Sequence, residues 1–299
     1  MARKVSRRGL FALGGLGVVA AGATGYALVD AGKLPGKAVL DRHLGRCDAP
    51  AAPAALRATP GPTVTGGFRS SRRRREVAFA ISYPPGYRDG APLAVCVLLH
   101  GYRSTARDAL TAGDYPQFIA GMVRDGAAPF AIAAVDGGDG YWHPHTTDDP
   151  LGMVLHEFIP LLRTRGLDTD RIAVAGWSMG GYGAMLCGLT RPGRFRAIVA
   201  TSPAVFHSYA DVHRHNAGAF DSSEEYHTYD VVRRATEFAG LPLRIAIGAA
   251  DPFAEAVRTL RDRLPDPSVV RITTGCHDNV FWASVAPEQV RAIGAALNG

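Results

Sequence analysis

The stretch that decides the fold is R-I-A-V-A-G-W-S-M-G-G-Y-G, residues 171–183. It begins as an apolar run of strand length and passes directly into a Gly-x-Ser-x-Gly sequence made by Gly176, Ser178 and Gly180. A serine on a sharp strand-to-helix turn needs small residues two positions to either side, because the turn is strained and closely packed. The stretch therefore predicts a strand, a turn and a helix that present Ser178 at a helix N-terminus, where the helix dipole favours developing negative charge.

Short apolar runs recur on both sides of this stretch and alternate with segments of helical pattern. One such segment, Leu151–Leu162, carries a single apolar stripe, and Pro287 is expected to open the last helix. Strands that are apolar along their length and alternate with helices predict an α/β fold, with a mostly parallel sheet covered on both faces. The expected strands are Val77–Tyr83, Leu93–Leu99, Phe130–Val135, Ile172–Ala175, Ala197–Thr201, Leu243–Ile247 and Val269–Thr273.

The composition agrees with a folded domain of this size. The chain has 299 residues, of which 47% are hydrophobic and 20% are charged, and these proportions exclude a disordered or collagen-like chain. The net charge is +6, but four of the cations, Arg3, Lys4, Arg7 and Arg8, lie within the first eight residues. Because the rest of the chain is nearly neutral, nucleic-acid binding is not expected.

The basic N-terminus resembles a bacterial twin-arginine export signal. Arg7 and Arg8 lie in the sequence S-R-R-G-L-F, and no charged residue occurs over residues 9–29. Such a segment is either cleaved after export or kept as a membrane anchor, since its length is about that of a bilayer core. We expect the twin-arginine export machinery as a partner and a secreted or cell-envelope location.

A serine nucleophile needs a general base, and the base needs a carboxylate that orients it. In chains with this kind of turn the order along the sequence is serine, acid, histidine. Asp251 and His277 each follow one of the expected strands, at the end where open parallel sheets place their sites. We predict a catalytic triad of Ser178, Asp251 and His277, with Asp230 as the reserve acid.

An acyl-transfer site also needs backbone N–H groups that stabilise the oxyanion. The residue after the nucleophile, Met179, is the first candidate, and Tyr102, which follows the expected strand Leu93–Leu99, is the second, with Arg103 as the alternative. Aromatic residues near the same rim are expected to line a pocket for a small-molecule ester substrate, or to belong to the core. The pocket candidates are Tyr141, Trp142, Trp177, Phe206 and Trp282.

His143 and His145 form a H-x-H pair on a loop after an expected strand. Two histidines at this spacing can bind a metal, but the sequence offers no matching third ligand. We therefore predict neither a metal nor a cofactor.

The four cysteines fall into two groups. Cys96 lies in an expected strand and Cys187 in the helix after Ser178, and both are expected to be buried thiols. Cys47 lies near the N-terminus and Cys276 directly precedes His277. Export to an oxidising compartment permits a Cys47–Cys276 disulfide, and four unpaired thiols are the alternative.

The chain divides into three parts on these grounds. Residues 1–30 are the signal or anchor, and residues 31–62, with five prolines among many alanines, are an arm or linker. Residues 63–299 are the catalytic domain. Within it the polar, histidine-rich segment 206–240 interrupts the alternation of strands and helices and is expected to form a cap.

Taken together, the motifs resemble the α/β-hydrolase superfamily, and within it the esterase branch that holds esterase D, bacterial feruloyl esterases and mycobacterial mycolyltransferases. The resemblance rests on L-L-H-G-Y, D-G-G-D-G-Y-W, G-W-S-M-G-G-Y-G, G-A-A-D-P-F and C-H-D-N-V-F-W, which lie between residues 98 and 282. It implies an α/β-hydrolase fold and the triad Ser178, Asp251 and His277. The export segment, the arm and the 206–240 insertion depart from the pattern, so no particular substrate is implied.

The expected activity is that of an exported serine esterase that acts on a carboxylic ester through an acyl-enzyme. An acyltransferase of the mycolyltransferase type is the alternative, because the same nucleophile can pass an acyl group to a sugar or an alcohol instead of water. A non-catalytic binding protein on a hydrolase scaffold is the third hypothesis. The complete set of serine, acid and histidine argues against that last hypothesis.

Overall fold

The computed structural model describes residues 25–30 and 37–299. Most of the predicted export segment, residues 1–24, lies outside the described residues. The chain separates into two compact units, Met1–Asp48 and Ala49–Gly299. None of the helices in the described ranges combines the length and the apolar character that crossing a bilayer requires.

The first unit contains the short helix α2, Lys37–His43. Within this unit Asp41 accepts hydrogen bonds from Lys37 Nζ at 3.2 Å and from Arg46 Nη1 at 2.8 Å, and Asp30 also pairs with Arg46. The predicted arm 31–62 is therefore partly helical, and the larger unit begins at Ala49 rather than at residue 63.

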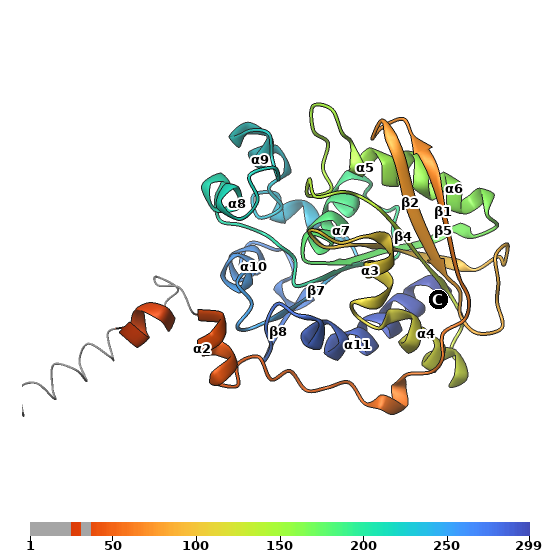
Figure 1. The fold of residues 1–299 in the computed structure, drawn as a ribbon, viewed down its shortest axis with the longest axis horizontal. Coiled ribbons are helices and arrows are strands. Elements are labelled where there is room, and N and C mark those ends of the chain that lie inside the picture. Colours follow the sequence, from red (N-terminus) through yellow and green to blue (C-terminus); the bar gives the residue numbers. More distant parts are fainter. Residues whose placement is uncertain (1–24, 31–36) are drawn as a thin grey trace, which may run out of the picture. The chain divides into compact units, whose positions relative to one another are not determined.

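The larger unit is built on one eight-stranded sheet with the order β1-β2-β4-β3-β5-β6-β7-β8 (Figure 1). The pairs β1–β2 and β2–β4 are antiparallel, and every other pair is parallel. The predicted mostly parallel α/β sheet is thus confirmed. The strands are β1 Thr63–Ser70, β2 Arg75–Ser82, β3 Ala94–Leu99, β4 Ala131–Val135, β5 Asp168–Trp177, β6 Ile198–Thr201, β7 Leu243–Gly248 and β8 Val270–Thr273.

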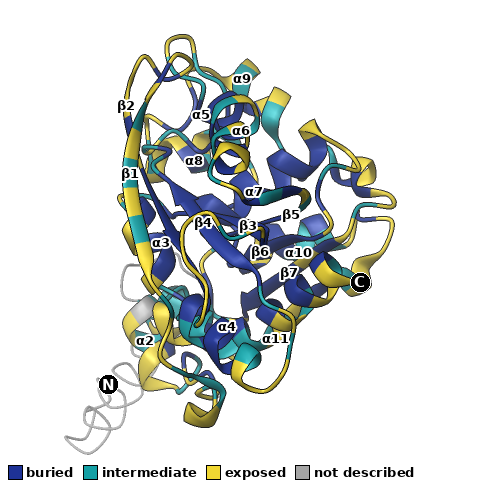
Figure 2. Cartoon of the chain, turned by 90° about the vertical axis from the view of Figure 1, so that its right-hand side faces the viewer, coloured by how far each residue is buried: buried dark blue, intermediate teal, exposed yellow. Residues whose placement is uncertain are grey.

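Each expected strand is present within a few residues of its predicted bounds, but β1 was not expected. Its sequence, T-V-T-G-G-F-R-S, contains no apolar run because it is an edge strand whose residues alternate between exposed and half-buried. Figure 2 shows this contrast between β1 and the buried central strands. The segment forms a strand because it pairs with β2, from Thr63 opposite Ser82 to Ser70 opposite Arg75.

Helices cover both faces of the sheet, and the side chains of the strands alternate between two cores. Odd-numbered residues 95–99 of β3 belong to a core shared with α6, α7 and α10. Even-numbered residues 94–98 belong to a core shared with α3, α4 and α11. This alternation is the period of two that a strand buried on both faces must show.

The helical elements of this unit fall mostly between strands, as the alternating pattern predicts. The segment expected over 151–162 is helical throughout and includes one π-helical turn, η2. The elements are η1 Ala54–Leu56, α3 Ala106–Thr111, α4 Tyr115–Arg124, α5 Pro150–Met153, η2 Val154–Phe158, α6 Ile159–Thr164, α7 Met179–Thr190, α8 Tyr209–His215, α9 Ser223–Tyr229, η3 Ala235–Phe238, α10 Ala254–Arg261, η4 Pro267–Val269 and α11 Asn279–Asn298.

The prediction that Pro287 opens the last helix is wrong. Helix α11 begins at Asn279, and Pro287 lies inside it. The true start is set by Asp278, whose carboxylate accepts the N–H of Phe281 at 3.0 Å as an N-cap. An interior proline costs a helix one hydrogen bond, and here burial of Ala286, Val290, Ile293 and Leu297 against the sheet offsets that cost.

The segment 206–240 forms the expected insertion between β6 and β7 and carries α8, α9 and η3. Ser208 and Ser222 cap the two α-helices by accepting backbone N–H groups of Asp211 and Glu225. The insertion is fastened to the sheet domain by the Tyr182 hydroxyl, which donates to Tyr229 O at 2.7 Å. It therefore has a fixed place beside the N-terminal half of α7.

The start of α7 packs against the end of β3 with no room for a side chain. A Cβ atom at Gly180 would lie 2.0 Å from Leu99 O, which belongs to the backbone and cannot rotate away. This close approach fixes the short distance between the first turn of α7 and the end of β3. It explains why the second glycine of the Gly-x-Ser-x-Gly sequence is required.

Replacing this glycine should loosen the junction of β3 and α7. We expect Gly180→Ala to lower the free energy of unfolding, measured by urea denaturation, by about 1–3 kcal/mol or more, because the overpacked atom meets backbone. Gly218→Ala is the matched control, since a Cβ there would meet only the Asn216 side chain at 3.6 Å, and its effect should stay within about 0.5 kcal/mol. Equal stability of the two variants would contradict the steric explanation.

Candidate active site

Ser178 lies on a strained turn between β5 and α7. Its φ is 55° and its ψ is −126°, a backbone conformation that costs a non-glycine residue free energy and is found mainly at functional sites. The turn is held by the N–H of Ser178, which donates to Thr201 O at 2.9 Å. It also needs Gly176, because a Cβ there would lie 2.3 Å from Gly180 O. The predicted turn is present, and the structure places Ser178 at the N-terminus of α7.

The structure brings Ser178, His277 and Asp251 together in one line of hydrogen bonds. His277 Nε2 lies 2.9 Å from Ser178 Oγ, and His277 Nδ1 lies 2.8 Å from Asp251 Oδ2. Because a carboxylate only accepts, Nδ1 carries the proton, and Nε2 is left to accept the Ser178 O–H. These contacts have the order and the tautomer that a serine nucleophile and a histidine base require.

The Asp251 carboxylate is fixed from both sides. Its side chain is fully buried, and its second oxygen, Oδ1, accepts the N–H of Phe253 at 2.9 Å. The reserve acid, Asp230, instead accepts the N–H groups of Val232 and Arg233, so it is engaged in a turn of the insertion.

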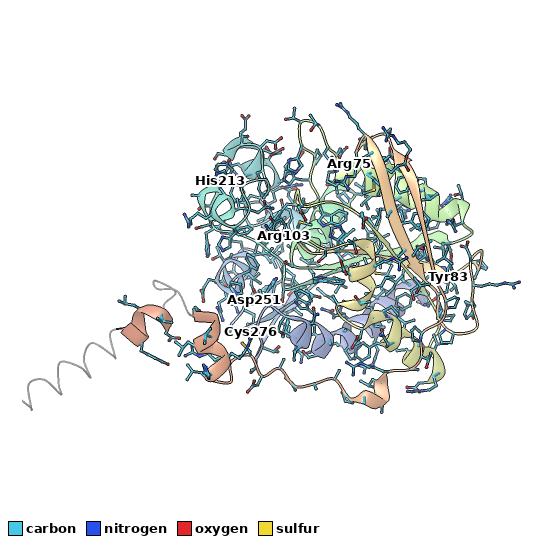
Figure 3. The ribbon with its side chains drawn as sticks, in the orientation of Figure 1. Arg75, Tyr83, Arg103, His213, Asp251 and Cys276 are labelled. Carbon is cyan, nitrogen blue, oxygen red and sulfur yellow. The ribbon has the colours of Figure 1, made fainter. Side chains whose placement is uncertain are left out.

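Neighbouring ends of β7 and β8 hold the acid and the base in register. Backbone hydrogen bonds join Ala249 N to Thr273 O at 2.7 Å and Ala250 N to Gly275 O at 3.0 Å. Gly275 has a φ of 150°, which an L-amino acid rarely adopts. These bonds tie the loop before His277 to the loop that carries Asp251, labelled in Figure 3.

Aromatic rings enclose the imidazole of His277. The Phe253 and Trp282 rings contact it edge to face at centroid distances of 5.1 and 5.5 Å. Trp282 in turn stacks on Trp177 at 5.8 Å. The rings restrict the orientation of His277, whose side chain is only 21% exposed to solvent.

The loop after β3 carries one of the two predicted oxyanion donors, Tyr102, and lies beside Ser178. A Cβ at Gly101 would lie 3.4 Å from the Cβ of Ser178, so this loop passes directly beside the nucleophile. The N–H of Arg103 donates to Asp139 Oδ1 at 2.7 Å, whereas no acceptor within the described residues takes the N–H of Tyr102. The geometry therefore favours Tyr102 over Arg103, together with Met179, whose N–H is unsatisfied as the first of α7.

Buried polar groups hold this loop against the loop after β4. His100 is fully buried, and burial lowers its pKa. Its neutral ring donates from Nδ1 to Gly101 O at 2.7 Å and accepts the N–H of Gly137 at Nε2 at 2.9 Å. Arg73, also buried, donates to Asp136 O and makes two hydrogen bonds to Asp148. His100 thus holds the two loops together.

The predicted pocket residues do not all line a pocket. Trp142 and Trp177 are at most 2% exposed. The Trp142 side chain occupies the space where side chains at Gly137 and Gly183 would lie. Tyr141 is also buried, so these three aromatics are core residues. The sequence left both roles open, because it shows which residues are aromatic but not which are covered.

Two of the pocket candidates do border the site. Trp282 is half-buried beside His277, and Phe206 lines a surface pocket together with His207, Asp211, His215 and Phe253. Phe253 was not predicted as a site residue, although it follows Asp251 by two residues. Its backbone N–H donates a hydrogen bond to Asp251, and its ring contacts His277. The motif G-A-A-D-P-F contained that signal.

The cysteines separate as the sequence suggested. Cys96 and Cys187 are free and fully buried, and burial raises the pKa of both thiols. Cys47 and Cys276 are each disulfide-bonded. A disulfide between Cys47 and Cys276 themselves stays a prediction from the sequence.

Comparisons with known proteins find relatives and solved structures that match most of the chain. An S-formylglutathione hydrolase of Paracoccus denitrificans is 27% identical over 262 residues, which cover 76% of this chain and 92% of that protein. Among solved structures, a ferulic acid esterase superposes with a TM-score of 0.69 at 19% identity and covers 79% of this chain and 97% of its own. An S-formylglutathione hydrolase from Agrobacterium tumefaciens gives a TM-score of 0.67 at 19% identity, with 81% and 97% covered.

These structural likenesses show that the α/β-hydrolase fold expected from the motifs is correct. The sequence profile of the Esterase family, described as putative esterase, matches residues 70–289. That range contains the strained turn with Ser178, the buried carboxylate of Asp251, and His277, whose ring lies between those two side chains. The chain therefore belongs to the putative esterase family.

Proposed function

We propose that the protein is a serine ester hydrolase that works through an acyl-enzyme formed on Ser178. The observation that carries the proposal is the line of hydrogen bonds from Ser178 through His277 to the buried Asp251. Membership of the esterase family supports the reaction class. The directions of these hydrogen bonds and the tautomer of His277 support a serine nucleophile activated by a histidine base.

In the first half of the reaction, Ser178 Oγ attacks the carbonyl carbon of the ester. As the C–O bond forms, His277 Nε2 takes the hydroxyl proton and the electrons of the carbonyl double bond move to its oxygen. Asp251 stabilises the imidazolium through Nδ1–H. The N–H groups of Met179 and Tyr102 donate to the oxyanion, in a site where the N-terminus of α7 also favours negative charge.

Collapse of this intermediate breaks the bond to the alcohol, which takes the proton from His277 as it leaves. The acyl group stays on Ser178. Water then gives a proton to His277 and attacks the acyl carbon, and the second tetrahedral intermediate releases the acid and regenerates Ser178. An alcohol in place of water would give transfer instead of hydrolysis, so product analysis in the presence of an added alcohol separates these outcomes.

The substrate is proposed as a carboxylic ester whose bound part reaches the pocket beside Asp251. The lining of that pocket combines the Phe206 and Phe253 rings with the polar groups of His207, Asp211 and His215. An acyl or alcohol part with both apolar and hydrogen-bonding groups suits such a lining. The names of the relatives support including a thioester and an aromatic acid ester in the substrate screen.

The site of action is proposed to be outside the cytoplasm. The supporting observation is the twin-arginine sequence around Arg7 and Arg8, followed by an uncharged stretch over residues 9–29. Whether this segment is cleaved or anchors the protein is left open by the sequence. Disulfide bonding of Cys47 and Cys276 agrees with an oxidising compartment.

Removing the nucleophile should abolish activity without disturbing the fold. Ser178→Ala deletes one oxygen, and loss of a triad member commonly lowers turnover by about 10⁴ to 10⁶. The measurement is hydrolysis of p-nitrophenyl esters of graded chain length, with thermal unfolding as the control for folding. Retention of more than about a tenth of the wild-type rate would show that another group is the nucleophile.

Replacing the acid should be damaging because His277 would lose its orienting acceptor. Asp251→Asn is expected to lower kcat by about 10⁴. Asp230→Asn is the matched control, since this carboxylate caps a turn of the insertion and makes no contact with His277. A larger loss for the Asp230 variant would mean that the acid is misassigned.

Export should depend on the arginine pair itself and not only on its charge. Arg7→Lys combined with Arg8→Lys keeps both cations but removes the pair that the twin-arginine route reads. We expect the double variant to stay in the cytoplasm as a folded protein, as seen by cell fractionation. Normal export of the variant would reduce the pair to an ordinary basic N-terminus.

A further inference from the structure

The loop after β4 meets the insertion at a cluster of two histidines and two carboxylates outside the triad. His145 Nδ1 lies 3.2 Å from Asp221 Oδ1 and 4.0 Å from Glu225 Oε1, and His143 Nδ1 lies 3.8 Å from the same Glu225 oxygen. One ligand atom from each of His143, His145 and Glu225 lies within 4.8 Å of the others. The third ligand that the sequence did not reveal is thus 80 residues beyond His145.

Both nitrogens of each histidine ring face an acceptor. His143 Nε2 lies 2.6 Å from Ala219 O, and His145 Nε2 lies 2.7 Å from Gly140 O. A carbonyl oxygen only accepts, so a neutral ring that donates to its carbonyl carries the proton on Nε2. In that tautomer each Nδ1 has a lone pair opposite a carboxylate, and a cation at the centre would bind both.

The carboxylates are held in the same manner through the oxygens that point away from the histidines. Asp221 Oδ2 accepts the N–H and the hydroxyl of Thr146 at 3.2 and 3.1 Å. Glu225 Oε2 accepts the N–H of Asp221. Each of the four side chains thus has one atom fixed by an outer partner and one atom facing the centre, which is how proteins orient metal ligands.

Without a cation, the centre of this cluster holds lone pairs opposite negative charge. Among the described residues the ion-pair partners of Asp221 and Glu225 are histidines only. Nearby Asp148 and Asp149 differ, because they pair with Arg73 and Arg72. His143 Nδ1 also faces Pro144 O at 2.9 Å, so in the same tautomer two acceptors meet there as well.

We propose that this cluster binds one divalent metal ion of the zinc class through His143 Nδ1, His145 Nδ1 and Glu225 Oε1, with Asp221 or water as the fourth ligand. Imidazole and carboxylate are ligands that zinc accepts at about 2.0–2.2 Å in tetrahedral geometry. Ligand atoms are then about 3.3 Å apart, close to the 3.2–4.0 Å separations from the carboxylates. Asp221, with 48% of its side chain exposed, gives the ion a way in.

The ion would fasten the insertion to the loop after β4, near the rim of the active site. Tyr141, on that loop, contacts the Phe206 ring at a centroid distance of 5.9 Å, and Phe206 contacts Phe253 at 5.2 Å. Phe253 in turn contacts His277. The proposed role is structural, and it goes beyond the esterase reaction, which uses none of the four side chains.

The test is zinc binding by the full chain, purified without a histidine tag and treated with a chelator. Isothermal titration with Zn²⁺ should show one equivalent bound with a Kd on the order of 1 μM or tighter, and saturating zinc should raise the Tm. Glu225→Gln and His145→Gln, both at partly exposed positions, should each weaken binding at least about tenfold while the circular dichroism spectrum stays that of the wild type.

Two control variants exclude other histidines as the source of binding. His213→Gln alters an exposed histidine of the same insertion, and His277→Gln removes the histidine of the triad. Both should bind zinc as the wild type does. The proposal is wrong if the wild type takes up less than about half an equivalent, if either ligand variant binds as tightly as the wild type, or if either control loses the binding. Because the readout is metal content and Tm, it does not depend on the proposed esterase reaction.

Discussion

The close packing of the strand-to-helix turn at Ser178 is the constraint on which the site depends. The turn exists because β5 lies between β3 and β6 at the centre of the sheet, and because glycines at 176 and 180 let backbone meet backbone at the start of α7. This packing stabilises a serine conformation that would otherwise be unfavourable. The proposed nucleophile, the proposed oxyanion donor Met179 and the helix N-terminus are positioned together by the same few atoms.

The other two residues of the proposed triad reach Ser178 because of the parallel arrangement of the sheet. Strands that run in one direction bring their carboxyl ends to one edge, so residues distant in sequence meet there. Asp251 after β7 and His277 after β8 reach Ser178 after β5 by this route. Burial of the Asp251 carboxylate and the rings of Phe253 and Trp282 then restrict His277 to one orientation.

Sequence patterns predicted the parts of the fold that are decided locally. The turn at Ser178, the buried strands and the order of serine, acid and histidine all appear as motifs or apolar runs. The edge strand β1 and the start of α11 did not, because one depends on its partner β2 and the other on the Asp278 cap. The burial of Trp142 and the meeting of His145 with Glu225 depend on how distant segments pack, and no spacing within the sequence records them.

The central claim is that Ser178 forms a covalent acyl intermediate. It is tested most directly by quenching the protein with acid during turnover of p-nitrophenyl acetate and locating the modified peptide by mass spectrometry. The structure predicts a single acetyl group on the peptide that contains Ser178, formed in a burst before steady-state turnover. An acetyl group on another residue, or hydrolysis with no covalent intermediate, would contradict the account.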